Sequence, residues 1–346
     1  MKRISQFIIR IASCFLSWIL LAGIFSNGVY LHAKDAAKNS DALYKEGRKL
    51  AAHSPRAAYH KFTRALESSS PEWKKRSECL LERGILLFKE EQYYPALSDL
   101  SQVIKLRPKH FLAHKTITKI LFVLKKYDQA IQESEVALEL NDRDPEIHYL
   151  RGRVFLMMYQ IGGNSLQGNI IASAVREFDD AIKGKRKYLD AYFHRAIAYM
   201  VSGNFKEAIQ DFEKVLKIND RVYQAWYEMA KAYQKQMNEL KTVEALEACL
   251  KIKESFLPAY QMLLPVCEKL RFKDKIQFYL DKAVKLFPQD PLIWSYIKRY
   301  PPPPKPAVVQ ESMKTPSPPP KPKEPVKKAP PPKPEKPEFV DSNYWY

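Results

Sequence analysis

The clearest pattern in this sequence is a series of apolar positions spaced three or four residues apart. In the stretch GNFKEAIQDFEKVLKIND (residues 203–220), Ala208, Phe212 and Val215 recur at that spacing. Most positions between them are Lys, Glu, Gln or Asp. An α-helix brings such positions onto one face, so the stretch predicts an amphipathic helix between two turns. A single helix of this kind cannot bury its apolar face alone and therefore needs neighbours.

The pattern recurs along the chain with a period of 34 residues, interrupted once by a step of 44. Two series of mostly small apolar residues fall on the predicted second helices: Ala96, Ala130, Ala174, Ala208, Thr242, Ile276, and Val103, Ala137, Ala181, Val215, Cys249, Ala283. A bulky series falls on the predicted first helices: Leu80, His114, His148, Tyr192, Trp226, Tyr260, Trp294. A mostly small series follows it by four residues: Gly84, Thr118, Gly152, Ala196, Ala230, with Leu264 as the exception.

Four series with one period predict a repeated helix-turn-helix unit. The bulky residue and the small residue lie one turn apart on the first helix, and the small residue lets the second helix approach closely. Each unit leaves an apolar face that only the next unit covers, so the units build one continuous core. Alternating β-branched runs between Gly turns are missing, which argues against a large sheet. The predicted fold class is all-α.

The sequence resembles tetratricopeptide repeat proteins, whose unit has this length and this order of bulky, small, aromatic and Ala positions. The likeness is strongest in AYFHRAIAYMVSGNFKEAIQDFEKVLKIND (191–220) and next in GILLFKEEQYYPALSDLSQVIKLRP (84–108). It implies a helix-turn-helix solenoid of about seven units plus a capping helix. The expected organisation is a degenerate unit at 41–70, six units over 77–290, a capping helix at 291–300 and a tail at 301–346.

Two places depart from the repeat. The unit from Pro145 to Arg186 carries ten extra residues between its helices, within YQIGGNSLQGNIIAS (159–173). Its glycines predict a surface loop, and no strand or GK[ST] accompanies them as a phosphate-binding loop requires. Pro265 falls inside a predicted first helix, where it removes a backbone donor, so we expect that helix to be kinked or shortened.

The N-terminal residues indicate export. MKRISQFIIR is basic, IASCFLSWILLAGIF is apolar, and SNGVYLHA is polar and turn-prone, which is the layout of a secretory signal peptide. We expect cleavage after Ala33 or after Gly28; the alternative is an uncleaved single-pass anchor, because the apolar run approaches spanning length. The expected location is the periplasm or cell envelope of a bacterium. With a net charge of +18, an exported chain favours acidic proteins or anionic envelope polymers over nucleic acid.

The sequence contains no pattern typical of an enzyme, a metal site or a cofactor site. GxSxG, HExxH, GxGxxG and P-loop motifs are all absent. His110 and His114 have the i, i+4 spacing of metal ligands, but no Glu accompanies them as in HExxH, and His114 is already explained as a member of the bulky series. Cys79, Cys249 and Cys267 have irregular spacing, so small buried thiols are expected instead of disulfides.

The resemblance implies binding of a protein or peptide along a concave groove lined by the first helices. The groove-facing positions include those one and five residues after the bulky series: Leu81, Ile85, Lys115, Lys119, Tyr149, Arg153, Phe193, Ile197, Tyr227 and Lys231. This lining is apolar at its start and then basic with aromatics between. It predicts partners that are acidic or carry a C-terminal carboxylate; the alternative is ordinary solvated residues of a basic protein.

The tail is rich in Pro and Lys from residue 301 to about 338 and then changes to FVDSNYWY (339–346). Dense Pro fixes φ and removes backbone donors, so we expect a largely disordered, extended segment. The predicted function is an exported scaffold for protein–protein interactions through the groove. The alternative is a structural protein that tethers the chain to the membrane or cell wall, with the repeats as a spacer and the tail as the contact element.

Overall fold

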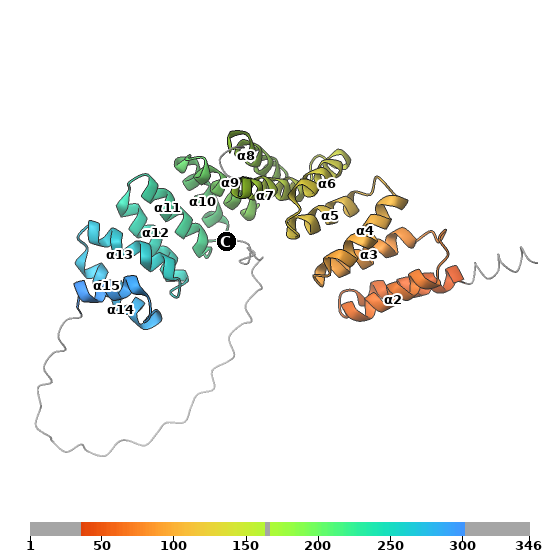
Figure 1. Ribbon diagram of the computed structural model, residues 1–346, viewed down its shortest axis with the longest axis horizontal. Helices are drawn as coiled ribbons and strands as arrows, with labels where there is room; N and C mark the ends of the chain where they lie inside the picture. Colours follow the sequence, from red (N-terminus) through yellow and green to blue (C-terminus); the bar gives the residue numbers. More distant parts are fainter. Residues whose placement is uncertain (1–35, 163–166, 302–346) are drawn as a thin grey trace, which may run out of the picture. The chain divides into compact units, whose positions relative to one another are not determined.

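The protein is described here as a computed structural model over residues 36–162 and 167–301. Within these ranges every regular element is a helix, and consecutive helices pack in pairs (Figure 1). The expected all-α helical repeat is therefore confirmed. The chain divides into two compact units, unit 1 (Met1–Gly203) and unit 2 (Asn204–Tyr346). The signal segment 1–33 and most of the tail, from residue 302 on, lie outside the described residues.

Unit 1 opens with a helix that is described over residues 36–50. It continues with α2 (Pro55–Ser68), α3 (Arg76–Lys89), α4 (Tyr93–Leu106), α5 (Phe111–Val123), α6 (Tyr127–Leu140), α7 (Pro145–Gly162), α8 (Gln167–Gly184) and α9 (Leu189–Val201). Within this unit α3 packs on α4, α5 on α6 and α7 on α8, and the first helices α3, α5, α7 and α9 contact one another in sequence.

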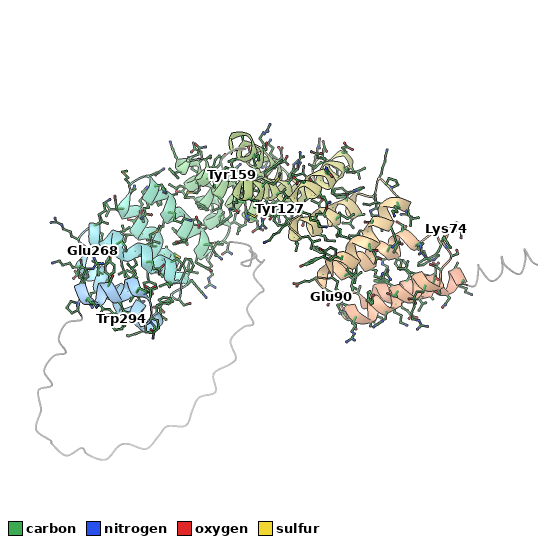
Figure 2. All side chains as sticks on the ribbon, viewed as in Figure 1. Lys74, Glu90, Tyr127, Tyr159, Glu268 and Trp294 are labelled. Atoms are coloured by element: carbon green, nitrogen blue, oxygen red, sulfur yellow. The ribbon has the colours of Figure 1, made fainter. Side chains whose placement is uncertain are left out.

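Unit 2 contains the remaining described helices. These are α10 (Phe205–Ile218), α11 (Tyr223–Lys235), α12 (Glu239–Ile252), α13 (Leu257–Lys269), α14 (Lys273–Leu286) and α15 (Pro291–Arg299). Glu268 on α13 fixes the last helix, because it accepts hydrogen bonds from the Tyr296 hydroxyl (2.7 Å), Arg299 (2.7 Å) and the Tyr300 hydroxyl (3.2 Å). No second helix follows α15 among the described residues. Trp294 lies on this last helix (Figure 2). Its side chain is 51% exposed.

The repeated apolar positions form the core. On α10, Ala208, Phe212 and Val215 have no exposed surface. All members of the two second-helix series are likewise fully buried. Burial of apolar area is the main favourable term that holds such stacked repeats together.

The small series is explained by the close approach of the paired helices. A Cβ added to Gly152 on α7 would lie 2.7 Å from the ring of Phe178 on α8, and one added to Gly84 on α3 would lie 3.0 Å from Leu100 on α4. Real Cβ contacts of 2.7 Å do not occur, so at Gly152 a larger residue would force the two helices apart. The packing of each pair therefore depends on this position.

The bulky series has a polar role that the sequence pattern did not predict. In several repeats, a side-chain nitrogen of the bulky residue lies within hydrogen-bond distance of a backbone carbonyl. This carbonyl belongs to the residue six positions earlier, in the turn that precedes the helix. These contacts are His114 to Pro108 (2.8 Å), His148 to Asp142 (2.9 Å), Trp226 to Asp220 (3.2 Å) and Trp294 to Pro288 (2.6 Å). The position thus satisfies a carbonyl that has no partner within the helix.

In five of the described helix pairs, the turn between the two helices has a left-handed residue at the same position of the repeat. The positive φ values are Glu91 (58°), Lys125 (58°), Gly203 (78°), Met237 (57°) and Arg271 (60°). Only Gly adopts this conformation without a steric cost, which is about 1–2 kcal/mol for other residues. The packing of the two helices therefore holds four side-chain-bearing residues in a conformation that they avoid elsewhere.

The expected surface loop within 159–173 is largely helical. α7 continues to Gly162 and α8 begins at Gln167, so both helices have 18 residues. Within this segment, residues 163–166 alone lie outside the described structure. The extra residues lengthen both helices, because α7 and α8 support each other along their length and this contact outweighs the weak helix propensity of Gly162 and Gly168.

Pro265 does not shorten its helix. α13 has 13 residues, the same length as α9 and α11. The helix continues through the proline because the surrounding residues Leu263, Leu264, Val266 and Cys267 are buried, and their burial offsets the lost backbone hydrogen bond.

Among the described residues, Cys79, Cys249 and Cys267 are buried and unpaired with one another, as predicted. Burial raises the pKa of Cys79 and Cys249 to about 12 and that of Cys267 to about 11. They are therefore protonated at neutral pH and behave as small apolar side chains.

Candidate protein-binding surface

The ten residues predicted to line a groove lie on the first helices of their units. They form pairs four residues apart: Leu81 and Ile85 on α3, Lys115 and Lys119 on α5, Tyr149 and Arg153 on α7, Phe193 and Ile197 on α9, and Tyr227 and Lys231 on α11. Residues four apart share one face of a helix. We call these positions on α3, α5, α7 and α9 the first-helix surface of unit 1, and those on α11 the first-helix surface of unit 2.

The surface of unit 1 begins with apolar residues that belong mostly to the interior. Leu81 is 9% exposed, and Ile85 is half-buried against the core of the unit. They leave little area for a partner, so the α3 part of the surface contributes to folding more than to recognition.

The lysines of α5 are engaged by acidic residues at the start of α7. Lys115 Nζ lies 2.8 Å from an Asp144 carboxylate oxygen and 2.9 Å from Glu146, and Lys119 Nζ lies 2.5 Å from Glu146. Asp144 also caps α7, since its Oδ1 accepts hydrogen bonds from the amides of Glu146 (3.0 Å) and Ile147 (2.9 Å). These four charged residues form a bridge between successive first helices, which we call the α5–α7 bridge.

Asp144, Glu146 and Lys115 are held in their charged forms. Burial opposes ionisation of Asp144, but hydrogen bonds from Lys115 and from the Ile147 amide outweigh it and lower the pKa. Burial likewise opposes ionisation of Glu146, and Lys119 and Lys115 together lower its pKa. For Lys115, burial works against the charge while Asp144 and Glu146 raise the pKa above its usual value.

The bridge changes the expected electrostatics of the surface. The sequence predicts a basic lining, but here two lysines are balanced by two carboxylates of the same chain. The Lys115 side chain is only 13% exposed, whereas that of Lys119 is 28% and that of Glu146 is 41% exposed. Lys115 is thus a structural cation, and Lys119 with Glu146 is the part that a partner can reach.

Arg153 on α7 is packed against aromatic rings instead of facing water. Its guanidinium lies 4.7 Å from the ring centre of Phe122 and 5.9 Å from that of Tyr149, and the residue is 9% exposed. A guanidinium over an aromatic face is stabilised by the ring quadrupole. Arg153 therefore joins the end of α5 to α7 and presents little charge at the surface.

Tyr149 is the centre of an aromatic cluster at the junction of α7, α8 and α9. Its ring centre lies 5.0 Å from Tyr188, 5.4 Å from His194 and 6.1 Å from Phe178. Burial and the nearby Arg153 lower the pKa of His194 to about 3, so this imidazole is neutral. The half-buried Tyr149 is the part of the cluster that offers rigid apolar area to a partner.

The positions on α9 are less accessible than predicted. Phe193 has no exposed surface, and Ile197 is half-buried. Phe193 is thus an interior residue and is removed from the candidate surface. The spacing rule failed because it identifies the face of a helix but not how deeply that face is covered.

The surface of unit 2 is built around α11. Tyr227 lies 5.1 Å from the ring of Phe256, which also lies 5.1 Å from Tyr223. Lys231 Nζ is 2.8 Å from Glu228, three residues earlier on the helix, and 5.6 Å from the Tyr227 ring. As in unit 1, the cation already has a carboxylate partner, and the aromatic residues supply the contact area.

The histidines singled out in the sequence have structural partners. His110 caps α5 by accepting a hydrogen bond from the Ala113 amide (3.3 Å). His114 uses both ring nitrogens, one toward Glu133 (2.7 Å) and the other toward the Pro108 carbonyl (2.8 Å). Among residues 36–162 and 167–301, no group of three or more His, Cys, Asp or Glu side chains is placed to hold a metal ion.

Sequence reasoning missed the acidic half of the α5–α7 bridge. The signal was present, because Asp144 directly precedes Pro145 and Glu146, and Asp before Pro at a helix start is typical of an N-cap. The pairing with Lys115 was not visible, since it depends on the distance between neighbouring first helices.

Comparisons with known proteins support the repeated helical fold. A family model described as the tetratricopeptide repeat matches residues 189–221. This stretch of the chain is therefore identified as a tetratricopeptide repeat. No curated protein sequence matches it significantly.

Solved structures of tetratricopeptide repeat proteins share its fold. One is a tetratricopeptide repeat protein from Parabacteroides merdae, with 15% identity, a TM-score of 0.54, and coverage of 75% of this chain and 98% of that one. Another is PilW, described as a widely conserved type IV pilus biogenesis factor, with 17% identity, a TM-score of 0.51, and coverage of 64% and 98%. At such identities the likeness concerns the fold.

Proposed function

We propose that this tetratricopeptide repeat protein is an exported, non-enzymatic scaffold that binds extended protein segments on the first-helix surface of unit 1. The repeat family supports protein–protein interaction as the general class. The observation that carries the finer proposal is the α5–α7 bridge with Tyr149 beside it. It places a partly exposed ion pair next to a rigid aromatic residue, which is a combination typical of interaction surfaces.

The bridge also restricts the chemistry of the partner. The lysines of this surface are already paired with carboxylates of the same chain. A segment with many acidic residues therefore gains little binding energy from electrostatic attraction to the surface as a whole. A single carboxylate, from an acidic side chain or a C-terminus, can replace Glu146 on Lys119, because these are the most exposed members. The proposed partner therefore carries one such carboxylate next to an apolar or aromatic residue that packs on Tyr149.

The test is site-specific photo-crosslinking of the full chain in the cells that produce it. We would place p-benzoylphenylalanine at Tyr149 on α7 and, as a control, at Tyr94, which is 66% exposed on the second helix α4. A partner that crosslinks from position 149 and not from position 94 supports the first-helix surface. Equal yields from both positions would contradict it.

The role of the ion pair is tested in the same background with Glu146→Gln. Removing the competing carboxylate frees Lys119, so crosslinking should rise about two- to fivefold, as expected for about 0.5–1 kcal/mol from a partly exposed pair. Lys119→Ala should lower it by a similar factor. Lys105→Ala on α4 is the matched control, since Lys105 is exposed on a second helix. A fall in yield with Glu146→Gln would contradict the proposal.

Export is supported by the sequence of residues 1–33, which lie outside the described structure. Among the described residues no helix is both long and apolar enough to cross a membrane. We propose a periplasmic or envelope location, with an uncleaved single-pass anchor as the alternative. Cell fractionation with N-terminal sequencing of the mature protein separates the two, because cleavage after Ala33 or Gly28 removes the apolar run.

The alternative function is a tether in which the tail grips anionic envelope polymers and the repeats act as a spacer. Its support is the Pro- and Lys-rich composition of residues 301–346. Deletion of residues 302–346 distinguishes the two functions. Loss of envelope association with unchanged crosslinking at Tyr149 would assign the tail to tethering, whereas loss of the partner itself would make the tail the main contact element.

A further inference from the structure

Unit 2 contains a pocket whose lining includes no residue of α11. It has a volume of about 340 Å³ and lies among α12, α13 and α14. Its walls include Leu250, Tyr260, Phe278 and Tyr279. The volume is at the lower end of the range for small-molecule pockets, about 300–1,000 Å³, which suits a single large side chain. We call it the α12–α14 pocket.

The wall of this pocket contains a buried hydroxyl that lacks a hydrogen-bond partner. Tyr260 on α13 has no exposed surface, and its hydroxyl is unpaired in the described structure. Its ring packs edge-on against Tyr279 (6.4 Å between ring centres) and Phe287 (5.8 Å). Buried polar groups almost always have a partner, so an unpaired hydroxyl in a pocket wall indicates a ligand that supplies an acceptor.

The mouth of the pocket carries an exposed aromatic residue. Phe278 on α14 is 54% exposed, and its ring stands edge-on to Tyr279 at 4.9 Å. Lys282 Nζ lies 4.9 Å from the Phe278 ring centre, within range of a cation–π contact. An exposed but rigidly held aromatic side chain beside a pocket offers a partner contact area at a low entropic cost.

Among the charged side chains at the mouth of the pocket, one cation is not part of an ion pair within the described structure. Lys282 pairs with Glu254 (2.8 Å), and Glu247 is bound by Lys275 from α14 (2.5 Å). Lys251, in the last turn of α12, is exposed and forms no ion pair within the described structure. The pocket thus favours a ligand that combines an aromatic ring, a hydrogen-bond acceptor and a nearby carboxylate.

The chain itself carries a segment with this chemistry. The described structure of unit 2 stops at Pro301, directly after α15, and residues 302–346 lie beyond it. Within them, FVDSNYWY (339–346) combines four aromatic side chains with Asp341. The intervening Pro-rich residues reach about 115 Å if extended at about 3.1 Å each, so they can span unit 2. Attachment to the same chain also gives the segment a high effective concentration at the pocket.

We propose that residues 339–346 dock in the α12–α14 pocket of their own chain. One aromatic ring enters the pocket against Phe278 and Tyr279, a backbone carbonyl accepts a hydrogen bond from the Tyr260 hydroxyl, and Asp341 pairs with Lys251. Docking closes the tail into a loop on unit 2. A partner with the same chemistry competes for the pocket and releases the tail, which couples tail extension to binding.

The test uses the full chain with p-benzoylphenylalanine in place of Phe278. After irradiation, mass spectrometry should find crosslinks to residues 339–346 within one chain, with a yield that does not depend on protein concentration. Tyr344→Ala combined with Trp345→Ala should lower that yield at least fivefold. The same probe in place of Tyr94, another exposed aromatic residue, is the control and should not crosslink to the segment.

Three outcomes would overturn the proposal. They are the absence of crosslinks from position 278 to residues 339–346, equal yields from positions 278 and 94, and crosslinks that join two differently isotope-labelled chains, which would make a second copy the occupant. Tyr260→Phe tests the hydrogen bond separately. It should lower the crosslink yield severalfold without lowering the thermal unfolding midpoint, and an unchanged yield would remove Tyr260 from the site.

Discussion

The α5–α7 bridge provides the sharpest test of how this solenoid is held together. Asp144 performs two tasks there, since it caps α7 through two backbone amides and pairs with Lys115. Asp144→Ala removes both. Loss of a side-chain N-cap costs about 1 kcal/mol. Loss of a hydrogen bond between charged groups costs about 1.5–3 kcal/mol, reduced here because Lys115 keeps Glu146. We therefore expect about 2–3 kcal/mol in total.

Asp144→Asn separates the two tasks. Asn is as good an N-cap as Asp, so the cap is retained while the charge is lost. We expect this variant to lose about 1–2 kcal/mol, less than Asp144→Ala. The assay is urea denaturation followed by circular dichroism, together with hydrogen exchange of the α7 amides. Exchange is needed because repeat arrays can open locally before they unfold as a whole.

The pH dependence follows from the direction of the pKa shift. The folded pKa of Asp144 is lowered below its unfolded value of about 3.9. The charge therefore contributes stability above pH of about 4, and this contribution is lost as the pH falls through the folded pKa. The difference between wild type and Asp144→Asn should shrink in acid.

Two results would refute this reasoning. Asp142 is an exposed Asp in the same turn, so Asp142→Ala is the matched control and should change stability by less than about 0.5 kcal/mol. If Asp144→Ala has no greater effect than this control, the bridge does not stabilise the fold. If Asp144→Asn is as destabilising as Asp144→Ala, the cap contributes nothing.

The other predictions concern packing, titration and thiol reactivity. Gly152→Ala should destabilise unit 1 by about 1–3 kcal/mol, because the fully buried Phe178 cannot move away from a Cβ at 2.7 Å. Gly84→Ala should cost less in the same denaturation assay, because its Cβ would lie farther from its neighbour, at 3.0 Å from Leu100. The pKa of His148 is raised by its hydrogen bond to Glu177, so its stabilisation is complete below the unfolded pKa of about 6.5 and is lost as the pH rises through the folded value. Stability measured between pH 6 and 9 should therefore fall in the wild type more than in His148→Gln. The three buried thiols should react with a thiol reagent only in denaturant, and fast labelling of the native chain would contradict their burial.

The sequence by itself determined the architecture of this protein. Buried positions such as Ala208 and Val215 recur every 34 residues, and a helix of fixed pitch turns that spacing into one apolar face per helix. The small position at Gly152 likewise predicted the close approach of paired helices. These features are local or strictly periodic, so they require no knowledge of distances between units.

The tertiary structure decided what the predicted surface presents to a partner. The position of Phe193 on the helix was predicted, but only packing showed that it is fully buried. The sequence alone suggested that the lysines of α5 carry unpaired charges. In the structure, Asp144 and Glu146 at the start of α7 form ion pairs with them. Likewise, the contact between α7 and α8 converted an expected loop into helix. Pairing and burial depend on distances between elements far apart in the chain, whereas a sequence pattern specifies only which side chains share a face.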